Sequence, residues 1–328
     1  MNHLHLKRRR WLIASSALTG LAATGMGPSA LAQDGSSYDE TWHDPKRSRD
    51  VPVRVRVPQR PGPWPVVIYS HGLGGNREGG DAWGTAWGEA GMLVLHVQHA
   101  GSDSAVWRQG LAALRAAANA QQLVDRVADV RFVLDDIERR QGTGVSPWRH
   151  ARLDRIGMAG HSFGARTTQA LAGERFIVPT QMFEPRLKAF IALSPSSNAR
   201  LPPAEAFAAI TEPFLAITGS LDGDPFGAFS TGESRERVYQ GLPPGQRALL
   251  WLDGADHMSF SGNVERRISG RGPLLRQPLA QERETVHHAL VARCTTLWWQ
   301  WRLGVDAAAW DELQRLPGLG ERDRLQLG

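Results

Sequence analysis

Cysteine and lysine are scarce in this sequence. Among its 328 residues Cys294 is the only cysteine, so no disulfide can form within the chain. Apolar residues at helical spacing on either side of Cys294 predict a buried structural thiol. The three lysines are Lys7, Lys46 and Lys188, and arginines scattered among acids carry nearly all the other positive charge. Because this charge is not clustered, the net charge of +5 does not predict nucleic-acid binding.

Metal-binding and membrane-spanning motifs are also missing. The sequence has no H-E-x-x-H and no paired Cys/His cluster, so we predict neither a metal nor a cofactor. The apolar stretch Trp11 to Leu21 is short and interrupted by Ser, Thr and Gly, and therefore does not predict a stable membrane span.

Residues 1–32 instead have the features of an export signal. A basic segment, Lys7 to Arg10, precedes the apolar stretch, and an A-x-A cleavage site lies at residues 30–32. Arg8-Arg9-Arg10-Trp11-Leu12 resembles the twin-arginine export consensus. We therefore expect a periplasmic or secreted protein.

The remaining sequence is predicted to contain a polar linker (33–50), a main domain (51–304) and a C-terminal extension (305–328). Within the main domain, short apolar runs alternate with amphipathic helical patterns. Strands are predicted at 51–57, 66–70, 92–97, 153–159, 189–193, 214–218 and 248–252, and helices at 111–140, 165–172 and 278–302. This alternation predicts an α/β fold with a mostly parallel central sheet covered by helices on both faces.

A G-x-S-x-G motif follows the predicted strand 153–159 and precedes a helix of small residues. It reads Gly160-His161-Ser162-Phe163-Gly164. The motif is typical of a turn so sharp that the serine adopts a strained conformation and its hydroxyl stands above the sheet edge. We therefore predict that Ser162 is a catalytic nucleophile.

A serine nucleophile needs a base, and the base needs an orienting acid. In hydrolases with this turn, the acid and the histidine follow the serine in that order, each after a strand. Asp222 and Asp224 follow the strand 214–218, and the G-x-x-D turn favours Asp222. His257 follows the strand 248–252 and is predicted to be the base, while Asp256 beside it is expected to be structural.

Two backbone N–H groups are needed to stabilise the oxyanion that forms during attack. The residue after the nucleophile, Phe163, should supply one. The glycine-rich loop 70–75 should supply the other, and we predict Leu73 because the flanking glycines permit close approach to a ligand. His71 is expected to brace this loop. A further hypothesis places Trp83, Trp87 and Trp107 near the substrate pocket.

The segments S-H-G-L-G-G (70–75) and G-H-S-F-G-A (160–165) together resemble the α/β-hydrolase superfamily, and within it the platelet-activating-factor acetylhydrolase and dienelactone-hydrolase-like group. The resemblance implies a sheet of about eight strands, a triad of Ser162, Asp222 and His257, and Leu73 and Phe163 as oxyanion donors. Two features differ from those families. No acid follows Leu193, where the acetylhydrolases have theirs, and Ser162 replaces the cysteine of dienelactone hydrolases.

The sequence thus predicts a serine hydrolase that cleaves small-molecule carboxylic esters with short to medium acyl groups. No insertion has the pattern of a large helical lid, which favours an open site. A peptidase or amidase with the same triad is one alternative. A non-catalytic α/β-hydrolase scaffold that binds a ligand or partner is the other.

Overall fold

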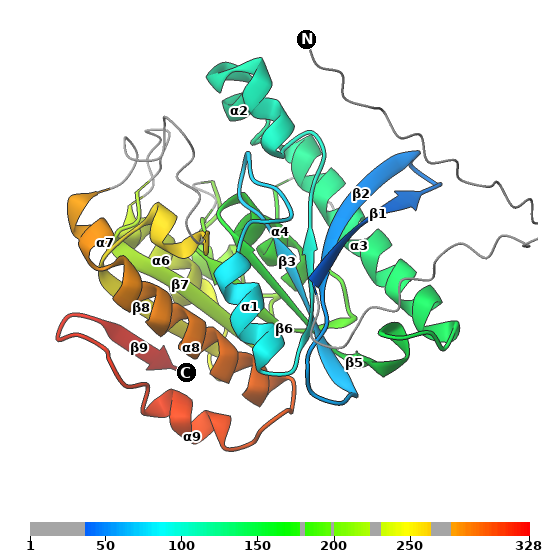
Figure 1. Ribbon diagram of the computed structural model, residues 1–328. Helices are drawn as coiled ribbons and strands as arrows, with labels where there is room; N and C mark the ends of the chain where they lie inside the picture. Colours follow the sequence, from blue (N-terminus) through cyan, green and yellow to red (C-terminus); the bar gives the residue numbers. More distant parts are fainter. Residues whose placement is uncertain (1–36, 178–180, 198–199, 224–230, 264–276) are drawn as a thin grey trace, which may run out of the picture. The chain divides into compact units, whose positions relative to one another are not determined.

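The computed structural model describes residues 37–177, 181–197, 200–223, 231–263 and 277–328, all within one compact unit, Ala32–Gly328. A nine-stranded sheet in the order β1-β2-β4-β3-β5-β6-β7-β8-β9 forms its centre (Figure 1). The strands are β1 Ser37–Asp44, β2 Arg49–Arg56, β3 Trp64–Ser70, β4 Leu93–Val97, β5 Ala151–His161, β6 Leu187–Leu193, β7 Phe214–Leu221, β8 Arg247–Asp256 and β9 Arg324–Leu327. Strands β4, β3, β5, β6, β7 and β8 pair in parallel, whereas β1, β2 and β9 are antiparallel to their neighbours.

Helices cover both faces of the sheet. They are α1 Asp81–Glu89, α2 Leu111–Ala116, α3 Ala120–Gly142, α4 Phe163–Ala172, α5 Pro203–Ala206, α6 Gly232–Gly241, α7 Pro278–Glu282, α8 Glu284–Arg302 and α9 Ala309–Gln314, with short 3₁₀ turns η1 Ser104–Gln109, η2 Trp148–His150 and η3 His257–Phe260. Helices α3, α4 and α6 contribute to one hydrophobic core, and α1, α8 and α9 contribute to the other. In the described parts of the chain, no helix is both long and apolar enough to cross a membrane.

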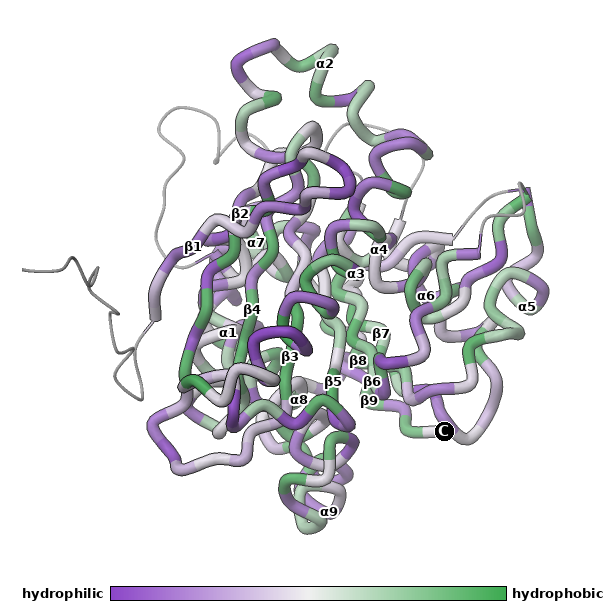
Figure 2. The backbone as a smooth tube through the Cα atoms, turned by 90° about the vertical axis from the view of Figure 1, so that its right-hand side faces the viewer, coloured by the Kyte–Doolittle hydropathy of each residue, from purple (hydrophilic) through white to green (hydrophobic). Residues whose placement is uncertain are grey.

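The central strands are apolar on both sides because each face packs under helices. In β3, Val66 and Ile68 belong to one core, whereas Val67 and Tyr69 belong to the other. All four are at most 1% exposed. Hydrophobic residues accordingly follow the central strands in Figure 2, with hydrophilic residues in the surrounding loops. Burial on both faces explains why these strands appear in the sequence as continuous apolar runs.

The sheet extends beyond the predicted main domain at both ends. Strand β1 lies within the predicted linker and pairs along its full length with β2, and β9 lies within the predicted C-terminal extension and pairs with β8. Both are edge strands with partly exposed residues, so they lack the continuous apolar signal of the central strands.

Two predicted helices are each interrupted in the structure. The helix predicted over 111–140 divides into α2 and α3, because the Asn119 side chain accepts a hydrogen bond from Gln122 N–H (2.9 Å) and caps a new helix. The helix predicted over 278–302 divides into α7 and α8 at Arg283.

Candidate active site

Four adjacent parallel strands end at one edge of the sheet, and a polar residue follows each of them. Ser162 follows β5, Ser194 follows β6, Asp222 follows β7 and His257 follows β8. The carboxyl ends of parallel strands meet at the same edge, where open α/β sheets bind their ligands. The sequence predicted roles for three of these residues and none for Ser194.

Ser162 occupies the sharp turn that its motif predicts. Its backbone has φ 56° and ψ −112°, a region that a residue with a side chain rarely adopts. A Cβ on Gly160 would lie 2.3 Å from Gly164 O, and a Cβ on Gly164 would lie 1.9 Å from Ser70 O. Only glycine therefore fits at either position. A hydrogen bond from Ser162 N–H to Leu193 O (3.0 Å) anchors the turn to the next strand.

Ser162, His257 and Asp222 form one chain of hydrogen bonds. His257 Nε2 lies 2.9 Å from Ser162 Oγ, and His257 Nδ1 lies 2.9 Å from Asp222 Oδ1. Because an ionised carboxylate only accepts, we assign the imidazole proton to Nδ1, which leaves Nε2 free to accept the Ser162 hydroxyl hydrogen. Asp222 is fully buried, and His257 is 7% exposed. This geometry can transfer a proton from Ser162 as its oxygen attacks a carbonyl.

The Asp222 carboxylate is held by more partners than the histidine alone. Ser194 Oγ donates to Oδ1 (2.7 Å), Thr218 Oγ1 donates to Oδ2 (2.8 Å), and the buried Arg235 guanidinium lies 3.0 Å from Oδ1. Burial opposes ionisation of this carboxyl, but the charge of Arg235 and the hydrogen bonds from His257 and Ser194 outweigh it and lower the pKa of Asp222. Asp222 is therefore a carboxylate at neutral pH.

Two other acids, Asp224 and Asp256, lie close to Asp222 and His257 in the sequence. Asp224, the alternative acid, lies outside the described residues. Asp256 caps η3 by accepting a hydrogen bond from Ser259 N–H (2.9 Å), as expected of a structural residue.

A second histidine supports His257 from below. His161 Nε2 donates to the backbone oxygen of His257 (2.9 Å), and the two rings lie 4.8 Å apart. Burial, with His257 close by, lowers the pKa of His161 to about 3. His161 is therefore neutral at pH 7 and places no charge beside the imidazole of His257.

Leu73 and Phe163, the predicted oxyanion donors, have unused backbone N–H groups. Within the described residues neither N–H donates a hydrogen bond, whereas the N–H of Gly74 donates to Ser102 O (2.9 Å) and that of Gly75 to Gly72 O (3.0 Å). Phe163 is the first residue of α4, where an N–H has no partner within the helix. A Cβ on Gly72 would lie 3.4 Å from Ser162 Cβ, so the glycine loop passes directly beside Ser162.

Next to this loop, a second serine, histidine and aspartate are joined by hydrogen bonds. Ser70 Oγ is 2.9 Å from His99 Nε2, and His99 Nδ1 is 3.0 Å from Asp129 Oδ2. All three residues are 0% exposed, so no substrate can reach them. Burial lowers the pKa of His99 to about 4, and Arg49 holds the other carboxylate oxygen of Asp129 (2.7 Å). We interpret this cluster as a brace for the glycine-rich loop 70–75, which begins at Ser70.

The three tryptophans considered for the pocket have separate positions. Trp83 and Trp87 are residues of α1 that are 0% exposed and pack in the core with α8. The hypothesis that these two lie near the substrate pocket was therefore wrong. Trp107 is half-buried, and its Nε1 donates to Gly74 O (2.9 Å), which ties η1 to the glycine-rich loop 70–75.

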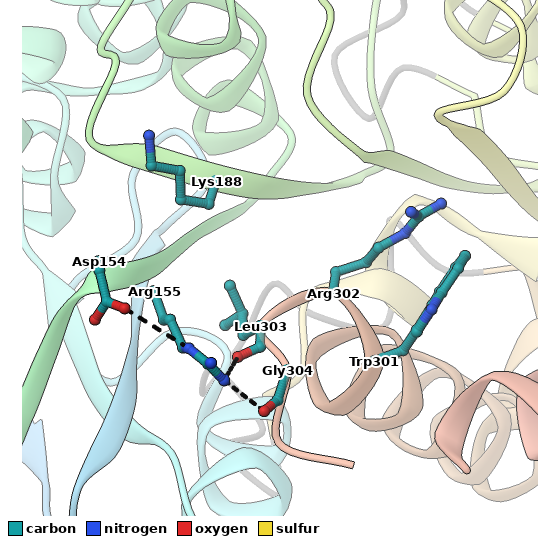
Figure 3. Close-up of a pocket in the computed structure, with 7 residues that line it drawn as sticks. All are labelled: Asp154, Arg155, Lys188, Trp301, Arg302, Leu303 and Gly304. Carbon is teal, nitrogen blue, oxygen red and sulfur yellow. Dashed lines mark hydrogen bonds and ion pairs between the residues drawn. The ribbon is translucent and has the colours of Figure 1, made fainter. Parts of the chain in front are cut away.

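A surface cavity of about 280 Å³ lies at the opposite end of the sheet (Figure 3). Asp154 and Arg155 of β5, Lys188 of β6 and the end of α8 line it. Arg155 Nη1 donates to Leu303 O (3.0 Å) and so ties β5 to α8. None of its lining residues is a predicted site residue. Across the described ranges, no cluster of His, Cys, Asp or Glu is arranged to hold a metal ion.

Comparisons with known proteins agree with this architecture. Residues 46–132 match the family model of platelet-activating factor acetylhydrolase, isoform II. The solved structure of a ferulic acid esterase from Streptomyces cinnamoneus superposes with a TM-score of 0.57 at 18% identity, covering 84% of this chain and 93% of the esterase. The chain has the α/β-hydrolase fold. A search of curated proteins found no match.

The α/β-hydrolase fold confirms the predicted fold class, with nine strands in place of about eight. The family match covers β2, β3, β4 and most of α3, including the glycine loop 70–75. It supports the resemblance to the acetylhydrolase group and the prediction of an ester hydrolase.

Three residues around the site were not predicted from the sequence: Ser194, Arg235 and Arg126. Ser194 has φ 56°, a left-handed conformation that no local sequence motif predicts. Arg235 reaches the site from α6. Arg126 did carry a signal, because it lies three residues after Leu123 and four before Val130, on the apolar stripe of α3. A charged residue on such a stripe indicates a buried polar contact.

Proposed function

We propose that this protein is a serine hydrolase of carboxylic esters that acts through an acyl-enzyme on Ser162. The observation that carries the proposal is the hydrogen-bonded chain from Ser162 through His257 to Asp222 at the turn after β5, with the loop containing Leu73 alongside. The acetylhydrolase family match and the esterase's shared fold support an ester as the substrate.

In the first half of the reaction, Ser162 Oγ attacks the ester carbonyl carbon while its proton passes to His257 Nε2. The carbonyl oxygen becomes an oxyanion and accepts hydrogen bonds from the N–H groups of Leu73 and Phe163. Asp222 keeps the imidazole oriented and stabilises its protonated form. When the tetrahedral intermediate collapses, the bond to the alcohol oxygen breaks, and His257 gives that oxygen its proton.

In the second half, water attacks the acyl carbon and His257 accepts its proton. The new tetrahedral intermediate collapses, the bond to Ser162 Oγ breaks, and His257 returns the proton to Ser162. The products are an alcohol and a carboxylic acid. The chain therefore needs no metal or redox cofactor for this sequence of steps.

We propose short to medium acyl groups as the preferred substrates. Among the described residues, the elements that follow β6 and β8 are short: α5 has 4 residues and η3 has 4. The longer helices α4 and α6, which follow β5 and β7, have 10 residues each and contribute to the hydrophobic core. Elements as short as α5 and η3 do not form a large helical lid of the kind we would expect over a site for long-chain lipids.

Hydrolysis of p-nitrophenyl esters from acetate to palmitate tests the proposal. Wild type should be most active on the shorter chains, and Ser162→Ala should lose activity by a factor of about 10⁴ or more. Ser37→Ala, an exposed serine of β1, serves as the matched control and should retain wild-type rates. A strong preference for palmitate would contradict the open site.

A fluorophosphonate probe separates the alternatives. An activated Ser162 should be labelled even if esters are poor substrates, and a folded wild type that stays unlabelled would favour the non-catalytic scaffold. If the wild type is labelled but hydrolyses no ester, and if it releases amines from acyl amides, it would instead be an amidase or peptidase.

We further propose that residues 1–32 direct export by the twin-arginine route to the periplasm or beyond. Cell fractionation of wild type and of an Arg8→Lys/Arg9→Lys variant tests this. Retention of only the variant inside the cytoplasm is expected, whereas equal export of both would contradict it.

A further inference from the structure

Arg126 is a fully buried cation directly behind the proposed oxyanion hole. It lies on α3 and is 0% exposed. Its guanidinium donates to the hydroxyl of Ser102 (Nε, 2.8 Å) and to the backbone oxygen of His71 (Nη1, 2.7 Å). Within the described residues no carboxylate lies within ion-pair distance of it. Burying such a group is costly unless its hydrogen bonds are satisfied, so these contacts fix the position of the guanidinium.

The loop half of the oxyanion hole depends on the orientation of one peptide unit. The carbonyl of Gly72 and the N–H of Leu73 belong to the same trans peptide, so they point in opposite directions. Gly72 O accepts from Gly75 N–H (3.0 Å) and His71 Nδ1 (2.7 Å), with Arg126 Nη2 at 3.5 Å. These donors hold the carbonyl on the Arg126 side. Leu73 N–H is therefore directed to the other side.

The protonation of His71 is fixed by its two partners. His71 Nε2 accepts from His99 N–H (3.1 Å), so Nδ1 must carry the hydrogen that it donates to Gly72 O. Burial, the charge of Arg126 and the nearby His99 lower the pKa of His71 well below its usual value. The ring therefore remains a neutral donor to Gly72 O.

The same guanidinium also contacts the nucleophile side of the hole. Its central carbon lies 4.3 Å from the ring centroid of Phe163, whose N–H is the other proposed donor. Burial lowers the pKa of Arg126 to about 9, with the charges of Asp129 and Asp103 opposing that fall, so the side chain is still a cation at pH 7. One side chain thus contacts both segments that supply oxyanion donors.

We propose that Arg126 is a positioning residue that sets the distance between the two oxyanion donors, by holding the His71–Leu73 backbone and the Phe163 ring against one rigid, planar group. This inference rests on the proposed function, because it assumes that Leu73 and Phe163 stabilise an oxyanion. Arg126 itself does not touch the substrate.

Replacing Arg126 should weaken transition-state stabilisation and leave ground-state binding intact. A displacement of about 1 Å in a catalytic group costs roughly 100-fold in rate, so Arg126→Met should lower kcat by about that factor with little change in KM. Arg126→Lys keeps the charge, but its ammonium lacks the planar fork of donors of the guanidinium and cannot stack as a plane on Phe163. It should lose roughly tenfold in kcat, and it is the second test if the methionine variant does not fold.

Two matched ketones distinguish positioning from general damage. An aryl trifluoromethyl ketone adds to a reactive serine and forms a tetrahedral oxyanion, whereas the corresponding methyl ketone binds as the planar carbonyl. In Arg126→Met, affinity for the trifluoromethyl ketone should fall by about the same factor as kcat/KM, with affinity for the methyl ketone unchanged. Arg139→Met on the same helix, where the side chain is 65% exposed, should change neither affinity.

Wild-type kcat and ketone affinities in Arg126→Met, or in Arg126→Lys, would overturn the inference. Equal losses for both ketones would also overturn it, because they would indicate general disruption of the site. Ketone affinity does not depend on turnover. Absence of ester hydrolysis by a wild type that binds the trifluoromethyl ketone would therefore count against the proposed ester substrate and leave the Arg126 comparison valid.

Discussion

Replacing Asp222 by asparagine tests which acid orients the histidine, and Ser194 sets the size of the effect. Loss of the acid in a serine, histidine and aspartate triad lowers kcat by about 10⁴-fold, or roughly 5.5 kcal/mol. In this protein Ser194 Oγ lies 2.7 Å from His257 Nδ1, so its hydroxyl can accept the Nδ1 hydrogen when the carboxylate is absent. One such neutral hydrogen bond contributes about 1–1.5 kcal/mol, or about tenfold.

We therefore expect Asp222→Asn to lose about 10³-fold in kcat and Asp222→Asn/Ser194→Ala to lose about 10⁴-fold. Ser194→Ala alone leaves the carboxylate in contact with His257 and should lose no more than about twofold, so additive effects would give the double variant a loss of only about 2 × 10³-fold. The two sites are thus predicted to be coupled rather than additive.

The assay is steady-state hydrolysis of p-nitrophenyl butyrate, normalised to folded protein by near-UV circular dichroism. Asp224→Asn is the matched control and should stay close to the wild-type rate. If Asp222→Asn retained activity within tenfold of wild type while Asp224→Asn lost it, the assignment of the acid would be refuted. Additive effects of the Asp222 and Ser194 changes would refute the predicted rescue.

Three further predictions concern buried residues: Gly164, His99 and Cys294. Gly164→Ala should destabilise the fold by about 2–4 kcal/mol in urea unfolding, because the added Cβ would lie 1.9 Å from Ser70 O; an unchanged midpoint would contradict the close packing of this turn against β3. The pKa of His99, about 4 in the fold, lies below its unfolded value, so the unfolded state binds more protons and stability falls as pH drops from about 6.5 toward 4. His99→Gln should therefore reduce the slope of unfolding free energy against pH by up to about 1.4 kcal/mol per pH unit, and an identical slope would exclude His99 as a source. Burial raises the pKa of the Cys294 thiol to about 12, so a thiol reagent should modify it only in denaturant, and rapid reaction of the native protein would show that it is accessible.

The central strands and the turn at Ser162 were predictable because their signals are local. Parallel strands buried on both faces read as continuous apolar runs, and the two glycines flanking Ser162 are required by close backbone contacts within the turn and with β3. The order of Asp222 and His257 along the chain followed from where the strands end. The structure brings these residues within hydrogen-bond distance of one another.

The residues around Ser162, Asp222 and His257 were not predictable, because their contacts depend on tertiary placement. Ser194 meets Asp222 only when β6 and β7 pair in their observed register, and Arg235 reaches the carboxylate from a helix that follows it. The edge strands β1 and β9 were missed for a different reason. Their pairing partners lie on one side only, and their residues are partly exposed, so the sequence carries a weak pattern.

The most direct test of the account is to trap the acyl-enzyme. Wild type and Ser162→Ala would be mixed briefly with p-nitrophenyl butyrate, quenched in acid, and analysed by intact and peptide mass spectrometry. One butyryl group is expected on the wild type, mapped to the peptide containing Ser162, and none on the variant. Rapid hydrolysis that persists in Ser162→Ala, or an acyl group mapped to another residue, would contradict it.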